Sequence, residues 1–255
     1  MIINFTAIYV LWLREMKRFV RAKSRIIGML AMPLLFLAFL GMGFSKMAIP
    51  GVEGGVGYIT FLVPGIVGMG MLFTSMFAGI SVLWDREFGF LKEIMIAPVS
   101  RVSIVLGRIA GGATTSLIQG MAILLISMVL GFGVASILSL ALAVVFMFLI
   151  STSFIGLGLI FASKMKDMQG FNLIMNFVIF PMFFLSGALY PIDNLPSFIK
   201  VVSYIDPLTY GIDGMRASLI GQSTFPAVLD FAVLLCISAV MVFLGAYFFE
   251  KSESV

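Results

Sequence analysis

The 255-residue sequence contains no histidine and a single cysteine, Cys236. Without histidine the chain cannot form histidine metal sites, histidine proton relays or serine–histidine triads. One cysteine excludes an internal disulfide, and we expect Cys236 to be a small buried apolar residue. The sequence also lacks a G-x-x-x-x-G-K-[ST] phosphate loop, so it cannot hold ATP by that route. We therefore predict no metal site, no cofactor and no catalytic residue in this chain.

Charge is also scarce, since only 11% of the residues are charged and 61% are hydrophobic. A soluble domain is about a quarter charged and about half apolar. Runs almost free of charge recur along the chain, and each is long enough to cross a bilayer as a helix. We therefore predict an all-α integral membrane protein with both termini in the cytoplasm. Its six transmembrane helices are expected near residues 26–45, 58–83, 103–131, 136–162, 170–189 and 227–249, the fifth kinked at Pro181.

The N-terminal segment, residues 1–25, combines an apolar stripe with a cluster of positive charge. The stripe recurs at helical spacing and consists of Phe5, Ile8, Trp12, Met16 and Phe19. The positive charges are Arg14, Lys17, Arg18, Arg21, Lys23 and Arg25. Such an amphipathic helix is expected to lie flat in the lipid headgroup layer, with Trp12, Met16 and Phe19 on its membrane side. A disordered basic tail or a nucleic-acid patch would leave the aromatic stripe unused, so we expect no nucleic-acid partner.

The distribution of Lys and Arg predicts the orientation in the membrane. If the N-terminus is cytoplasmic, the inner side carries 13 of the 16 positive charges. The outer side then keeps only Lys46, Lys200 and Arg216. Short cytoplasmic loops carry an excess of Lys and Arg, so this asymmetry favours cytoplasmic termini.

A charged island, residues 84–101, separates the second and third predicted spans. Phe88, Leu91, Ile94 and Met95 share one face of a possible short helix, which Pro98 would end. Charged residues surround this face at Arg86, Glu87, Lys92, Glu93 and Arg101, and Gly89 lies between them. The island is either a helix that docks a cytoplasmic partner or a solvated loop that joins two spans.

Residues 190–222, between the fifth and sixth spans, are expected to form two short amphipathic helices on the outer face. Asn194 can cap the first, whose apolar face is Leu195, Phe198, Ile199 and Val202. Asp206-Pro207 is a favourable start for the second. Asp213 and Arg216 lie three residues apart on that helix and can pair.

Polar side chains and glycines within the spans indicate how the helices pack. Gln119, Asn172 and Asn176 cannot bond back to their own helix easily, so they should face protein or a transport pathway. Gly107 and Gly111 form a G-x-x-x-G pair that permits close helix contact, either within one subunit or at a dimer seam.

Two motifs together resemble the ABC-2 type permeases, the membrane subunits of ATP-binding-cassette exporters. The island carries the first, in Asp85-Arg86-Glu87, Gly89, Leu91, Lys92-Glu93, Pro98-Val99-Ser100-Arg101 and Gly107-Arg108. The second comprises Asn172, Phe180-Pro181, Phe184-Leu185-Ser186-Gly187, Tyr190-Pro191, Leu195-Pro196, Asp206-Pro207-Leu208-Thr209-Tyr210, Asp213 and Arg216. The resemblance covers nearly the whole chain and is nearest to the daunorubicin-resistance-type drug-efflux permeases. Polysaccharide and lipid exporters share these features.

The resemblance implies a single transmembrane domain over residues 1–255 that pairs with a second permease chain, as a homodimer, in the plasma or inner membrane. Two copies of a separate ATPase would bind ATP and Mg²⁺ and hydrolyse the ATP, and residues 84–101 would be the coupling loop that rests on that ATPase. The expected cargo is a hydrophobic or amphipathic drug, lipid or glycan. A self-contained channel or secondary carrier is the alternative. A carrier should show inverted repeats and broken helices with midplane charge, and the sequence shows neither clearly. An intramembrane enzyme would need a nucleophile with a base, which the sequence does not supply.

Overall fold

The structure is a computed structural model that describes residues 3–44, 57–89, 99–165 and 168–252. Within these residues every regular element is helical. The long helices are α1 (Phe5–Arg21), α2 (Lys23–Gly43), α3 (Tyr58–Glu87), α5 (Arg101–Val129), α6 (Ile137–Lys164) and α11 (Ala227–Ser252). The shorter elements are α7 (Met168–Ile174), the π-helix η1 (Met175–Ile179), α8 (Phe180–Leu185), the 3₁₀-helix η2 (Ile192–Asn194), α9 (Ser197–Ile205) and α10 (Pro207–Ile220).

Five of the described helices, namely α2, α3, α5, α6 and α11, are long and apolar enough to cross a membrane. They lie within a few residues of five predicted spans, although α3 continues beyond residue 83 to Glu87. The predicted fifth span differs, because its apolar helical stretch covers only Gln169–Leu185. It is built from α7, η1 and α8 in succession.

The irregular turn of this fifth segment precedes Pro181. Proline lacks an N–H and its ring crowds the carbonyl four residues earlier, which here belongs to Phe177. The helix widens to a π-turn over Met175–Ile179, and the N–H of Phe180 donates to the carbonyl of Met175. The departure from α-helical geometry that the proline predicts therefore begins six residues before it.

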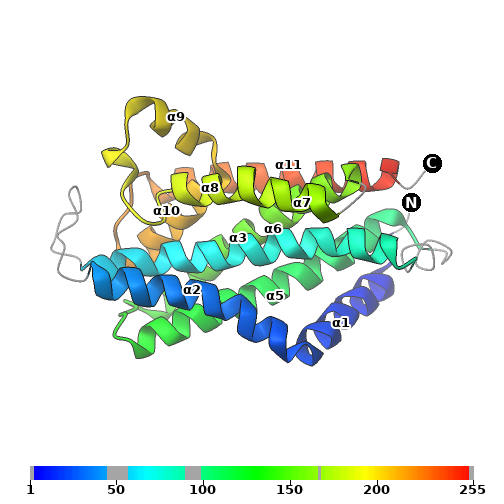
Figure 1. Ribbon diagram of the computed structural model, residues 1–255, viewed down its shortest axis with the longest axis horizontal. Helices are drawn as coiled ribbons and strands as arrows, with labels where there is room; N and C mark the ends of the chain where they lie inside the picture. The colour runs from blue at the N-terminus through cyan, green and yellow to red at the C-terminus, as the bar shows by residue number, and fades with distance from the viewer. Residues whose placement is uncertain (1–2, 45–56, 90–98, 166–167, 253–255) are drawn as a thin grey trace.

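The helices run roughly along the long axis of the molecule, with α3 at the centre (Figure 1). α3 packs against α2, α5, α6 and α10, and most of its residues are buried. α2 and α11 lie at the periphery and are mostly exposed. Cys236 on α11 is exposed, so the expectation that it is buried is wrong. Its helix contributes only a narrow face to the core and leaves the rest free for lipid.

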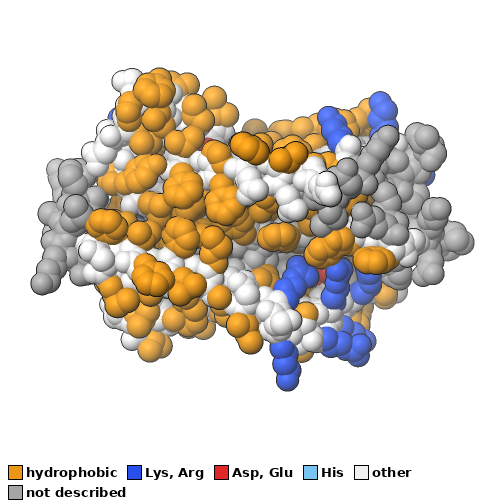
Figure 2. All heavy atoms as spheres, in the orientation of Figure 1, with side chains coloured by type: hydrophobic (Ala, Val, Ile, Leu, Met, Phe, Trp, Pro, Cys, Tyr) orange, Lys and Arg blue, Asp and Glu red, His pale blue; other side chains and the backbone are white. Residues whose placement is uncertain are grey.

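The described segments divide between the two ends of the molecule. α1 and both chain termini lie at one end, whereas α9 and α10 lie at the other (Figure 1). On the face shown in Figure 2, Lys and Arg side chains gather at the end that carries α1, and hydrophobic side chains cover most of the rest. The gathering of Lys and Arg side chains at one end agrees with the uneven distribution of positive charge that the sequence predicts.

The segment after α8 departs from the prediction in two ways. α9 begins at Ser197 with Pro196 as its cap, and Asn194 instead lies in the 3₁₀ turn. α10 begins at Asp206-Pro207 as predicted, but it is buried among α3, α6 and α11 rather than lying on the outer face. Gly214 makes this insertion possible, because a Cβ there would lie 2.1 Å from the ring of Phe146.

Candidate functional site: a charged junction and an apolar groove

α1 is held against α5 by hydrogen bonds and by close backbone contact. The N–H of Asn4 donates to Ser103 Oγ at 2.9 Å, and Trp12 Nε1 donates to Thr114 Oγ1 at 3.0 Å. A Cβ added at Gly107 or Gly111 would lie 2.8 Å from side-chain atoms of α1. The G-x-x-x-G pair therefore serves packing within one subunit, which was one of its two interpretations.

The predicted stripe of α1 is only partly available to lipid. Phe19 is buried, while Trp12 and Met16 are half-buried, so these residues face the protein in large part. Phe5 and Tyr9 remain exposed on the outside of the helix. That α1 lies in the lipid headgroup layer stays a prediction.

A charged junction links three helices at the end of the bundle that carries α1. Asp85, near the end of α3, is only 5% exposed. Its Oδ1 accepts from Arg14 Nη2 on α1 at 3.0 Å, and its Oδ2 accepts from Arg14 Nη1 at 3.2 Å. Oδ2 also accepts from Arg108 Nη2 on α5 at 2.6 Å. Burial of a charge is costly unless the charge is paired and hydrogen-bonded. The two arginines therefore offset the cost of burying the Asp85 carboxylate, and the carboxylate offsets the cost of burying Arg108.

Sequence reasoning missed this junction, because Asp85 was assigned to a water-exposed island. α3 instead continues through Glu87, which keeps Asp85 inside the bundle. The signal in the sequence was Arg108, a charge inside the predicted third span that needs a partner within the protein.

The structure describes only the two ends of the charged island, residues 84–89 and 99–101. Arg86 and Glu87 lie in the last turn of α3, and Phe88 is 83% exposed. Gly89 has a φ of 74°, a left-handed conformation that ends the helix. Arg101 is the first residue of α5, where Ser100 Oγ accepts from the N–H of Ser103. The predicted residues Leu91, Lys92, Glu93 and Pro98 lie outside the described residues.

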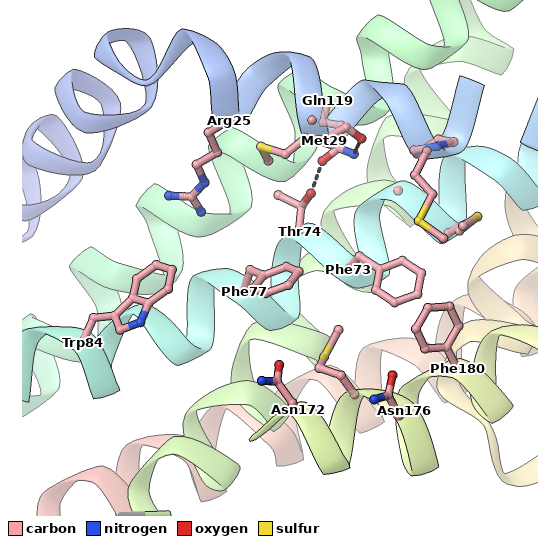
Figure 3. Close-up of a pocket in the computed structure, with 16 residues that line it drawn as sticks. Arg25, Met29, Phe73, Thr74, Phe77, Trp84, Gln119, Asn172, Asn176 and Phe180 are labelled. Atoms are coloured by element: carbon pink, nitrogen blue, oxygen red, sulfur yellow. Dashed lines mark hydrogen bonds between the residues drawn. The ribbon is translucent and has the colours of Figure 1, made fainter. Parts of the chain in front are cut away.

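An apolar groove of about 560 Å³ opens between α2 and the α7–α8 segment, with α3 as its floor (Figure 3). Its described lining residues are Arg25, Gly28, Met29, Met32, Pro33, Met69, Gly70, Phe73, Thr74, Phe77, Trp84, Gln119, Asn172, Met175, Asn176 and Phe180. The structure thus brings together all three residues predicted for a pathway, Gln119, Asn172 and Asn176.

These three amides differ in how they are used. Gln119 is buried; its Nε2 donates to the carbonyl of Met29 at 2.8 Å, and Thr74 Oγ1 donates to its Oε1. It therefore ties α2, α3 and α5 together. Asn172 and Asn176 are exposed, and their side-chain amides form no hydrogen bond within the part of the chain that the structure describes. Both amides remain available to a ligand or a partner chain.

Asp213 and Arg216 do not pair with each other, so that prediction is wrong. Asp213 accepts from the backbone N–H groups of Thr224 and Phe225 at 2.8 to 2.9 Å. The guanidinium of Arg216 lies 3.8 Å above the ring of Phe61, and its Nη2 donates to the carbonyl of Gly187 at 3.1 Å. Because α10 is buried, backbone groups of neighbouring segments compete successfully for both side chains.

Asp206 caps α10 as predicted. Its Oδ1 accepts from the N–H of Leu208 at 2.9 Å, which satisfies one free donor of the first turn. The side chain is almost fully buried, and this burial raises the pKa of Asp206 to about 8.

Comparison with known proteins agrees with this architecture. The sequence model of the ABC-2 type transporter family matches residues 6–220. The chain belongs to the ABC-2 type transporter family. This family is a membrane transport component, so the molecule is a transport permease and a multi-pass protein of the inner membrane.

Individual relatives are similar over most of their length. Nodulation protein J of Rhizobium meliloti (strain 1021) is 32% identical over 226 residues, covering 88% of this chain and 85% of that protein. The inner membrane transport permease YadH of Escherichia coli (strain K12) is 29% identical over 235 residues, covering 90% and 89%. The putative transport permease ycf38 of Cyanophora paradoxa is 29% identical over 219 residues, covering 84% and 75%. The daunorubicin-resistance subgroup stays a prediction.

Proposed function

We propose that this ABC-2 permease is the membrane subunit of an exporter that moves a hydrophobic or amphipathic substrate outward. A separate ATPase subunit, present in two copies, would supply the energy from ATP. The observation that carries the proposal is the charged junction, in which Asp85, itself part of the island, joins α1, α3 and α5. A partner that moves the island would therefore move three helices together.

α3 provides the mechanical path from the island to the groove. It runs without interruption from Tyr58 to Glu87, and its side chains Phe73 and Phe77 line the groove. A tilt of its cytoplasmic end is therefore transmitted to the groove wall. At its other end the island leads directly into α5, which begins at Arg101 and contributes Gln119 to the same groove.

The groove is proposed as the substrate pathway of a homodimer. In an isolated chain the free amides of Asn172 and Asn176 would face lipid, where an unsatisfied polar group is costly. A second copy placed against the groove would cover both amides and enclose the pathway. Cytoplasmic termini, expected from the charge asymmetry, would place α1 and the junction on the ATPase side.

The test of this function is co-purification of the permease with its ATPase subunit from membranes. Apolar residues at the centre of an interface usually dominate its binding energy, whereas charged residues around them tune encounter. Leu91→Asp should therefore abolish recovery of the ATPase, and Lys92→Ala should weaken it only modestly. Permease levels are held equal by immunoblotting. Full recovery of ATPase with Leu91→Asp would reduce the island to a connecting loop and overturn the proposal.

A further inference from the structure

The groove holds a positive charge, that of Arg25, which makes no ion pair with the side chains that the structure describes. Arg25, near the start of α2, is the one charged residue among the described residues that line the groove. It forms neither an ion pair nor a hydrogen bond with any side chain of the described ranges. The charged groups that face it are Glu15 and Arg18 of α1. Figure 3 shows its guanidinium at the end of the groove where Trp84 lies.

Beyond this charge the groove is apolar over a considerable length. α3 lines it from Met69 to Trp84, which corresponds to about 22 Å at the rise of an α-helix. Phe73 and Phe77 face the amides of Asn172 and Asn176 across the groove (Figure 3). The site therefore offers a cation at one end, two free amides along one wall and an apolar wall opposite.

We propose that the groove binds an amphiphile with an anionic group, which Arg25 pairs with while the apolar body lies along Phe73 and Phe77. A neutral hydrophobic ligand would leave the arginine unpaired next to an apolar surface, and a cationic ligand would be repelled. An anion instead forms a charge-assisted hydrogen bond, which is about twice as strong as a neutral one. The proposal rests on the transport function above and specifies the class of its cargo.

The test measures quenching of Trp84 fluorescence by tail-brominated amphiphiles. Trp12→Phe provides the background, because the chain has two tryptophans. The purified full-length chain is placed in phosphatidylcholine vesicles with a brominated alkyl sulfate or the matching uncharged brominated alcohol. We expect saturable quenching by the sulfate at a mole fraction about tenfold lower than by the alcohol, which corresponds to about 1.4 kcal/mol.

The variants separate pairing in the groove from general attraction to a basic surface. Arg25→Gln should abolish the preference for the sulfate, and Arg25→Lys should retain most of it. Arg21→Gln is the matched control, since it removes the same charge from an exposed position on α1 outside the groove. Equal quenching by sulfate and alcohol in the unchanged protein would overturn the proposal. So would an equal loss of preference in Arg21→Gln and Arg25→Gln.

A second probe, tail-brominated phosphatidylglycerol, identifies the source of the anion. Saturable quenching that Arg25→Gln removes assigns the site to the headgroup of a membrane lipid. Quenching by the single-chain sulfate alone assigns it to a smaller amphiphile, and either result supports the anionic site. Because no ATPase is present, a failure here leaves the co-purification test of the transport function untouched.

Discussion

At the scale of single residues, the structure depends on buried charges whose partners lie on other helices. Asp85 is the clearest case, since one carboxylate contacts two arginines from different helices. Arg108 is almost fully buried, whereas Arg14 is partly exposed. The two arginines should therefore differ in how much they depend on Asp85.

Replacement of Asp85 by Asn tests this dependence. Removing one partner of a buried ion pair costs about 3–5 kcal/mol, because the other charge is left uncompensated. Asp85→Asn should therefore destabilise the protein strongly, and Arg108→Gln added to it should recover part of the loss. Thermal unfolding in detergent measures both. Strictly additive effects of Asp85→Asn and Arg108→Gln on stability would contradict the pairing. Arg14 is more exposed than Arg108, so Arg14→Gln should destabilise the protein less than Arg108→Gln.

Asp206 gives the fold a predictable pH dependence. Its pKa is raised from an ordinary 3.8 to about 8 by burial, so the folded chain keeps a proton that the unfolded chain releases. Stability should fall as the pH rises between these values and should level off above about 8. Asp206→Asn keeps a good cap but cannot ionise, so its melting temperature should change less between pH 6 and pH 8. Parallel pH profiles for the two proteins would rule out this role.

At the scale of elements, sequence patterns located the long helices well because hydrophobic length alone defines them. The start of α10 was also predicted, since Asp206-Pro207 is a local signal. Local spacing failed for Asp213 and Arg216, whose partners are 11 or more residues away in sequence or on other elements. It also failed to show that Asp85 is buried, because the length of α3 depends on contacts with α1 and α5.

The same reasoning applies to the candidate site. The sequence identifies Gln119, Asn172 and Asn176 as candidates for the site, because a polar side-chain amide inside a membrane needs a polar environment. That they share one groove could not be predicted, because it depends on how α5 and the α7–η1 segment pack around α3.

α1 offers a test at the level of an element. Trp12→Glu and Phe19→Glu place charge on the face that contacts α5 and should detach the helix from the bundle and loosen it from the membrane surface. Phe19 is 8% exposed, so its loss should cost about 3 kcal/mol. Val20→Glu is the matched control, because Val20 is 66% exposed. Limited proteolysis of α1 and transport assays provide the measurement, and equal behaviour of the Phe19 and Val20 variants would disprove the packing role.

At the scale of the whole molecule, the two ends differ in charge and in construction. The end with α1 and the termini is basic and held by ion pairs, whereas the end with α9 and α10 is held by backbone contacts to buried side chains. Residue patterns predicted this polarity, because the Lys and Arg excess of cytoplasmic segments is a property of composition.

Reporter fusions test the orientation. A reporter placed after Val255 should be active only in the cytoplasm. One inserted at Gly131, in the turn between α5 and α6 at the opposite end, should be active only outside. A C-terminal reporter that is active outside the cell would reverse the topology and with it the proposed site of the ATPase.

The burial of α10 also has a consequence for the order of assembly during synthesis. α10 carries Asp213 and Arg216 into the bundle, yet one of the helices that packs around it, α11, is made after it. Until α11 has entered the membrane, these two charges lack part of their surroundings, so α10 is expected to stay at the membrane surface. α11 would therefore close the end of the bundle that carries α9 and α10, and chains truncated before residue 227 should insert their earlier spans while leaving α10 accessible to water.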